Sequence, residues 1–110
     1  MGMDATLIGI GFFSPQVAHH LCYPADHYDG VPRGAPVITT VVELNASEPS
    51  RRLAEILGID PTDLGGHQIT QTKAASIDPS LLGEAFGEGV ARDFSALRRN
   101  GFRFYFMPNY

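Results

Sequence analysis

The stretch that most constrains the fold is residues 36–44, which read P-V-I-T-T-V-V-E-L. Seven of these nine residues are Val, Ile, Thr or Leu, and β-branched side chains suit a pleated strand because their χ1 angles are restricted. Alternate positions place apolar side chains on both faces, with Val37 and Val41 on one face and Ile38 and Val42 on the other. A strand that is apolar on both faces is typically buried on both. The pattern therefore predicts the central strand of a sheet.

The remaining elements follow from periodicity and from turn residues. We expect strands over 4–12, 67–72 and 102–107, of which the second is short and at an edge. We expect helices over 14–22, from 47 or 50 to 57, over 78–86 and from 90 to 100, with a single helical turn at 60–63. The chain then forms one domain, 1–110, of the α/β or α+β class, with a single three- or four-stranded sheet and about four helices packed on it.

Two features bear on how these strands pack. Gly9 and Gly11 remove side chains from one face of the first strand, which suggests a bulge or a close neighbour at that face. Phe102, Phe104 and Phe106 alternate in the last strand, so they point to one face and the residues between them point to the other.

Composition and charge narrow the classes of function. The net charge is −4 and only 18% of the residues are charged, which argues against a nucleic-acid binder because such proteins carry a basic surface. Cys22 is the single cysteine, so no internal disulfide can form. The apolar run over 7–13 lacks a basic leader and is followed by Pro15, so it predicts neither a signal peptide nor a membrane span. We therefore expect a protein without nucleic-acid or membrane partners, and the lone cysteine leaves the compartment open.

Two patterns leave open a small metal- or nucleotide-dependent enzyme or ligand-binding domain. Residues 9–14, G-I-G-F-F-S, are a degraded form of the glycine-rich dinucleotide fingerprint, with Glu43 in the region of a ribose-binding acid. The possible metal ligands gather between residues 19 and 29: His19, His20, Cys22, Asp26, His27 and Asp29. Neither pattern has the spacing of a recognised motif, and no serine lies in a nucleophile elbow. We therefore expect no enzyme activity, no cofactor and no metal, and we assign no catalytic residue.

The longest segment without helical or strand periodicity is 23–35, Y-P-A-D-H-Y-D-G-V-P-R-G-A. Unpatterned segments of this length are often functional. Its tyrosines offer rigid amphipathic area, and its aspartates offer charge that complements a basic partner. We expect the partner-binding residues to come from this loop, with two from elsewhere: Tyr23, Asp26, His27, Tyr28, Asp29, Arg33, Glu43 and Tyr110.

Several phrases of the sequence resemble a group of small bacterial proteins. The phrases are G-M-D-A-T-L-I-G-I-G-F-F-S at the start, Y-P-A-D-H-Y in the loop, V-I-T-T-V in the strand, S-R-R-L-A-E-I-L-G-I-D-P in a helix and G-F-R-F-Y-F-M-P-N at the end. We associate this group with immunity proteins of polymorphic or type VI secreted toxins. The resemblance implies a bacterial cytoplasmic protein that binds one cognate toxin and blocks its active site. It carries over no site residue.

The aromatic last strand allows a further possibility, a structural subunit of a homo-oligomer. A strand at the edge of a sheet exposes N–H and C=O groups with which a second copy can pair. This arrangement requires residues 102–107 to lie at an edge, and the sequence alone leaves the strand order and the oligomeric state open.

Overall fold

The computed structural model describes residues 4–60 and 66–109, so Tyr110 and most of the turn expected at 60–63 lie outside the described residues. This part of the chain contains four strands: β1 (Asp4–Phe12), β2 (Pro36–Leu44), β3 (His67–Ile69) and β4 (Arg103–Asn109). It also contains four α-helices: α1 (Ser47–Leu57), α2 (Gln71–Ser76), α3 (Pro79–Phe86) and α4 (Glu88–Arg99). Two short 3-10 helices, η1 (Ala18–His20) and η2 (Ala25–Tyr28), lie between β1 and β2.

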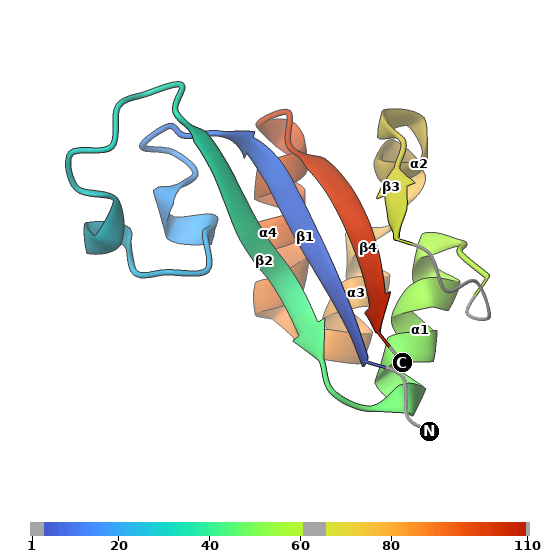
Figure 1. The fold of residues 1–110 in the computed structure, drawn as a ribbon. Coiled ribbons are helices and arrows are strands. Elements are labelled where there is room, and N and C mark those ends of the chain that lie inside the picture. The colour runs from blue at the N-terminus through green and yellow to red at the C-terminus, as the bar shows by residue number, and fades with distance from the viewer. Residues whose placement is uncertain (1–3, 61–65, 110) are drawn as a thin grey trace.

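The strands form one antiparallel sheet in the order β2-β1-β4-β3. Figure 1 shows α3 and α4 behind this sheet, while the near face of the strands is uncovered. The buried side chains of β1 and β4 occupy alternate positions, as expected for a sheet with helices on one face only. The architecture is an α+β fold with a four-stranded sheet and four α-helices in the described residues, which confirms the expected fold class.

β2 has the predicted bounds but not the predicted position, because it is an edge strand and the inner strands are β1 and β4. Two features explain its apolar residues on both faces. The register shifts between Leu7 and Ile8, which leaves Val41 without a partner on β1, and Val41 and Val42 are consequently both buried. Ile38 is instead 67% exposed on the uncovered face. The prediction of a central strand is therefore wrong: a bulge and an exposed apolar residue produce the same pattern.

The prediction of a helix over 14–22 is also wrong, because only η1 forms there and the backbone is extended at Leu21. The N–H of Cys22, which an α-helix would direct to the carbonyl of Ala18, donates instead to Oγ1 of Thr39 on β2 at 2.8 Å. Thr39 is buried, and a buried hydroxyl requires a hydrogen-bond partner. A tertiary hydrogen bond thus replaces the helical one.

α2 is a helix that the sequence analysis does not predict. The edge strand expected over 67–72 is confirmed only as far as residue 69, after which the side chain of Thr70 caps the helix. At the other end, Nη1 of Arg98 donates to the carbonyl oxygens of Ala74 and Ile77, both at 2.8 Å. The last carbonyls of a helix lack partners within the helix. An arginine of α4 therefore stabilises the end of α2.

A layer of phenylalanine side chains joins the sheet to the helices. Phe104 and Phe106 of β4 are at most 1% exposed. The ring of Phe94 on α4 lies 4.7 Å, centroid to centroid, from that of Phe104, a separation typical of a favourable aromatic pair. Phe102 is buried with them, which confirms that the three alternating phenylalanines of the last strand share one face.

The glycines of β1 make room for this layer. A Cβ atom on Gly9 would lie 3.4 Å from the nearest atom of Phe102, which is ordinary contact. A Cβ atom on Gly11 would lie only 2.6 Å from atoms of the same ring, including its Cγ. The close neighbour that the sequence suggests at these glycines is therefore the ring of Phe102.

We expect Gly11→Ala to lower the free energy of unfolding by about 1–3 kcal/mol, because the added methyl group overlaps a buried ring. Gly9→Ala is the matched control and should change the free energy of unfolding by less than about 0.5 kcal/mol. Urea unfolding of both variants measures these values. Equal stability of the two variants would contradict the tight packing of Phe102 on Gly11.

Asp78 caps α3, and Pro79 is the first residue of that helix, both as predicted. Oδ1 of Asp78 accepts hydrogen bonds from the backbone N–H of Ser80 at 3.0 Å and from its hydroxyl at 2.8 Å. The backbone bond first, and then the hydroxyl bond, holds the pKa of Asp78 below its ordinary value. The ionised carboxylate therefore stabilises the fold above the ordinary aspartate pKa, and this contribution is lost as the pH falls through the lower pKa of the folded state.

Asp78→Ala should accordingly lower the urea midpoint at neutral pH, and its difference from the unsubstituted protein should shrink as the pH is lowered from about 7 to about 3. Glu84→Ala, at an exposed position of the same helix, serves as the control and should shift the midpoint little. A difference for Asp78→Ala that stays constant over this pH range would contradict the capping role of the ionised form.

Candidate functional site

Residues 13–35 leave the sheet at the adjoining ends of β1 and β2 and lie beside β2, at the edge of the sheet (Figure 1). We call this segment the excursion. Two backbone hydrogen bonds close its base: the N–H of Phe13 donates to the carbonyl of Ala35 at 2.7 Å, and the N–H of Gly34 donates to the carbonyl of Phe13 at 2.8 Å. These bonds continue the pairing of β1 with β2 by one step. The excursion therefore begins and ends at one place on the sheet.

The first half of the excursion is held to the rest of the molecule by three kinds of contact. The side chains of Val17 and Leu21 are buried in the core. The N–H of Cys22 donates to the buried Thr39, as described above. Nδ1 of His20 lies 3.0 Å from Oδ1 of Asp93 on α4. The excursion is thus fixed both to β2 and to α4.

Four rings in contact, three of them from the second half of the excursion, form what we call the aromatic row. Tyr23 stacks on His27 with ring centroids 4.5 Å apart, and His27 meets Tyr28 edge to face at 5.1 Å. Tyr28 in turn stacks on the buried Phe13 at 5.8 Å. Burial is the main cause that raises the pKa of Tyr28, and the neighbouring Cys22 adds to it, so the phenol stays neutral. The row leads from the core to Tyr23, which is 56% exposed.

Most of the predicted partner-binding residues lie together in this second half. Asp26 and Asp29 are exposed, within and next to η2, beside the rings of the aromatic row. Arg33 is also exposed, and its Nη2 donates to Oε1 of Gln16 at 3.4 Å. Glu43 is separated from them, because it lies near the end of β2 that is distant from the excursion. Tyr110 lies outside the described residues.

The two patterns considered for metal or nucleotide chemistry do not assemble. No three His, Cys, Asp or Glu side chains within residues 4–60 and 66–109 come together as a group that could hold a metal. His20 faces Asp93, whereas His27 lies between two tyrosine rings. Gly9 and Gly11 lie under phenylalanine rings, and no α-helix follows them. They therefore lack the strand–turn–helix geometry that holds a pyrophosphate.

The structure also has a second surface, which the sequence analysis does not predict. We call the sheet face that points away from the helices the open sheet face. The pairing of the strands places thirteen described side chains on it: Asp4, Thr6, Ile8, Ile10, Phe12, Pro36, Ile38, Thr40, Glu43, Gln68, Arg103, Tyr105 and Met107. Three of the apolar ones are strongly exposed, Phe12 at 68%, Ile38 at 67% and Met107 at 46%. The sequence of β1 does contain a signal for this face, because apolar residues at 8, 10 and 12 alternate with the glycines and therefore point to the face that the glycines do not occupy.

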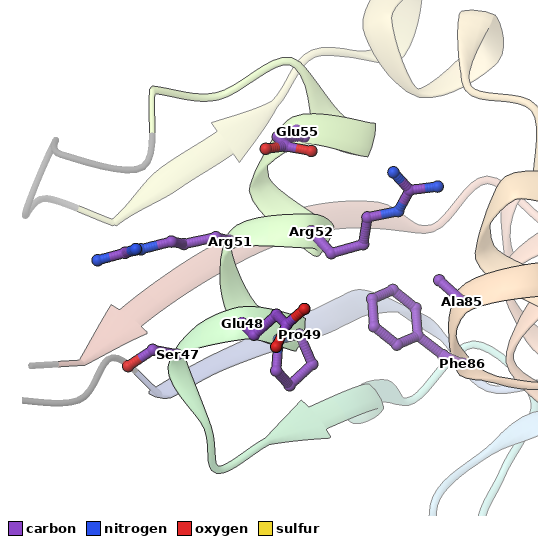
Figure 2. A pocket seen from close by; sticks show the side chains of 8 residues that line it. All are labelled: Ser47, Glu48, Pro49, Arg51, Arg52, Glu55, Ala85 and Phe86. Atoms are coloured by element: carbon purple, nitrogen blue, oxygen red, sulfur yellow. The ribbon is translucent and has the colours of Figure 1, made fainter.

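A shallow hollow of about 810 Å³ lies between α1 and α3 (Figure 2). In Figure 2, Arg52 reaches towards Phe86 and Arg51 points away from it. The acidic and basic residues of the hollow all belong to α1 and are three or four positions apart, as on a solvated helix face whose charges compensate one another. The hollow is therefore a weaker candidate than the aromatic row.

Comparisons of the chain with family models, with curated proteins and with solved structures find no match. None of the helices in the described part of the chain combines the length and the hydrophobicity needed to cross a lipid bilayer. Inference about function therefore depends on the geometry of the two surfaces, the aromatic row and the open sheet face.

Asp93→Ala should loosen the excursion, because it removes the contact of His20 with α4 and leaves the core side chains in place. A partly buried hydrogen bond contributes about 1 kcal/mol, so local opening should increase roughly five- to tenfold. Amide hydrogen exchange over residues 17–28 measures the opening, with Glu84→Ala as the control. Unchanged exchange in the Asp93→Ala variant would contradict the anchoring of the excursion to α4.

Proposed function

We propose that this protein is an immunity protein that binds a cognate bacterial toxin and neutralises it by covering the toxin's active site. The observation that carries the proposal is the aromatic row, in which the exposed rings of Tyr23 and His27 are held through Tyr28 on the buried Phe13 and are flanked by Asp26 and Asp29. The proposal also draws on the resemblance of the sequence to small bacterial immunity-type proteins.

The row has the properties of a protein-binding site. Tyrosine side chains contribute large contact areas and lose few rotatable bonds on binding. Because the rings already stack on one another and on the buried Phe13, little conformational entropy remains to be lost. Affinity can therefore come from this small, pre-organised patch at the centre of an interface of ordinary size, roughly 1,600 Å² in total.

The charge of the site indicates the kind of partner. Asp26 and Asp29 are exposed beside the row, and the whole chain has a net charge of −4. Opposite charge on a partner raises the rate of association and disfavours wrong partners. A toxin whose active site is basic, such as one that acts on a phosphate-containing substrate, would fit this surface. Inhibition would then be steric and would require no chemistry from this protein.

The proposal predicts that a gene beside this protein's gene encodes the toxin, and the product of that gene is made in bacteria with and without this protein. We expect the toxin to arrest growth and this protein to restore it. Tyr23→Ala and Asp26→Lys should each weaken the complex by about 30-fold in isothermal titration calorimetry, as expected for central interface residues. Tyr23 is preferred to Tyr28 for substitution because Tyr28 also packs on Phe13.

Glu84→Lys is the matched control, since it makes the same change of charge on α3, away from the excursion. Its affinity for the toxin should be close to that of the unsubstituted protein. Unaltered binding of both site variants would remove the aromatic row from the interface. Failure of this protein to form a complex or to restore growth would refute the proposed function.

A further inference from the structure

The open sheet face has an unusual composition for the solvent side of an antiparallel sheet. Such a face is normally polar, yet here Ile8, Ile10, Phe12 and Ile38 occupy adjacent positions, and Met107 of β4 lies diagonally from Ile8. We call these five side chains the apolar patch. Three of the five large apolar side chains that are exposed in the described residues lie in it. No described α-helix covers this face, and Figure 1 shows the strands unobstructed from this side. A contiguous exposed apolar patch marks an interaction surface.

The strand register defines where the charges of this face lie. Ile8 is the centre of a three-by-three grid, with Thr40 of β2 on one side and Tyr105 of β4 on the other. Two residues along β1 from Ile8, Ile10 lies between Ile38 of β2 and Arg103 of β4. Two residues in the other direction, Thr6 lies between Glu43 of β2 and Met107 of β4. Arg103 and Glu43 therefore occupy diagonally opposite corners of the grid.

These two corner charges are exposed, and neither makes an ion pair with any other side chain in the described residues. The other two corners are apolar, Ile38 on β2 and Met107 on β4. The face is consequently complementary to itself: one diagonal carries a positive and a negative charge, and the other carries two apolar side chains.

We infer that two copies of this chain pack through the open sheet face about a two-fold axis that passes at Ile8 and runs along the Ile38–Met107 diagonal. This axis places Arg103 of each copy opposite Glu43 of the other, so one symmetric contact forms two ion pairs. Ile8, Ile38 and Met107 lie on the axis and pack against the same residues of the second copy. The result is two sheets packed face to face with their strands crossing at a steep angle.

The area of the face predicts a weak dimer. Four strands spaced about 4.8 Å apart are roughly 15–19 Å wide. Because the strands of the two copies cross at a steep angle, the two sheets overlap over about this width in both directions. Each copy therefore contributes roughly 225–360 Å², and the pair buries about 600 Å², the size of a weak contact. Association should accordingly require roughly 10–500 µM protein.

A second copy fits this face better than the edge-to-edge assembly that the last strand suggests. β4 lies between β1 and β3, so its backbone is already paired on both sides from Phe104 to Phe106. The dimer is also independent of the proposed toxin binding, because the rings of the aromatic row do not belong to the open sheet face. Glu43 has its role in the dimer, away from the other predicted partner-binding residues.

Sedimentation velocity at about 10–500 µM tests the dimer with the full chain. The unsubstituted protein should shift from monomer to dimer over this range, as expected for a small interface. Ile38→Asp should raise the dimer dissociation constant at least tenfold, because it places a charge in the apolar patch. Leu81→Asp, at an exposed apolar position of α3, is the matched control and should leave the dissociation constant unchanged. Circular dichroism verifies that both variants are folded.

Charge reversal tests the symmetry of the contact. Arg103→Glu alone and Glu43→Arg alone place like charges opposite each other twice in each dimer, so both should raise the dissociation constant at least about tenfold. The double variant R103E/E43R should restore association. An equimolar mixture of the two single variants should also dimerise, because both charge pairs are then complementary.

Three results would overturn the inference. The first is a protein that stays monomeric up to about 500 µM, the upper end of the range expected for a small interface, which would leave the face to another protein or to a further segment of the chain. The second is a dimer that is insensitive to Ile38→Asp. The third is a mixture of the two charge variants that associates no better than either variant alone. Toxin binding by the excursion, measured separately, is unaffected by any of these results.

Discussion

The structure depends on the close approach of Phe102, which precedes β4, and of Phe104 in β4 to the glycines of β1. Gly11 has no Cβ atom where the ring of Phe102 lies, and the ring of Phe104 is next to Gly9. The two inner strands can therefore carry a layer of large rings on one face without a gap beneath it. Phe94 of α4 packs on this layer with its ring centroid 4.7 Å from that of Phe104, which joins the helices to the sheet.

This layer has a consequence for the rest of the surface. All large aromatic side chains of the core lie on the helix side of the sheet, so the opposite face receives the alternate residues of the same strands, including Ile8, Ile10 and Tyr105. The excursion is a separate surface, because its anchors, Thr39 and Asp93, belong to β2 and α4. The molecule thus has two distinct candidate binding surfaces, one of stacked rings beside the β2 edge of the sheet and one of apolar side chains on its open face.

The candidate site could be predicted from the sequence in part. The composition of residues 23–35 identifies Tyr23, His27 and Tyr28 as candidates, and the structure places their rings in contact. The composition could not indicate that Glu43 lies apart from these rings, because the position of Glu43 depends on the path of the chain after the loop. The histidines and Cys22 are close in sequence, yet His20 faces α4 while His27 faces the tyrosines. Proximity along an irregular segment does not determine which side chains converge.

What the sequence determined by itself is local. The bounds of β1 and β2, the cap of α3 at Asp78 and the end of α1 at Gly58 follow from side-chain alternation and from residues with specific backbone preferences. Only the tertiary structure decided that β2 lies at an edge, that Cys22 bonds to Thr39 instead of extending a helix, and that one sheet face is uncovered. The physical reason is that strand order, bulges and the side on which helices pack arise from contacts between residues distant in sequence, and a local pattern of apolar residues is compatible with several such arrangements.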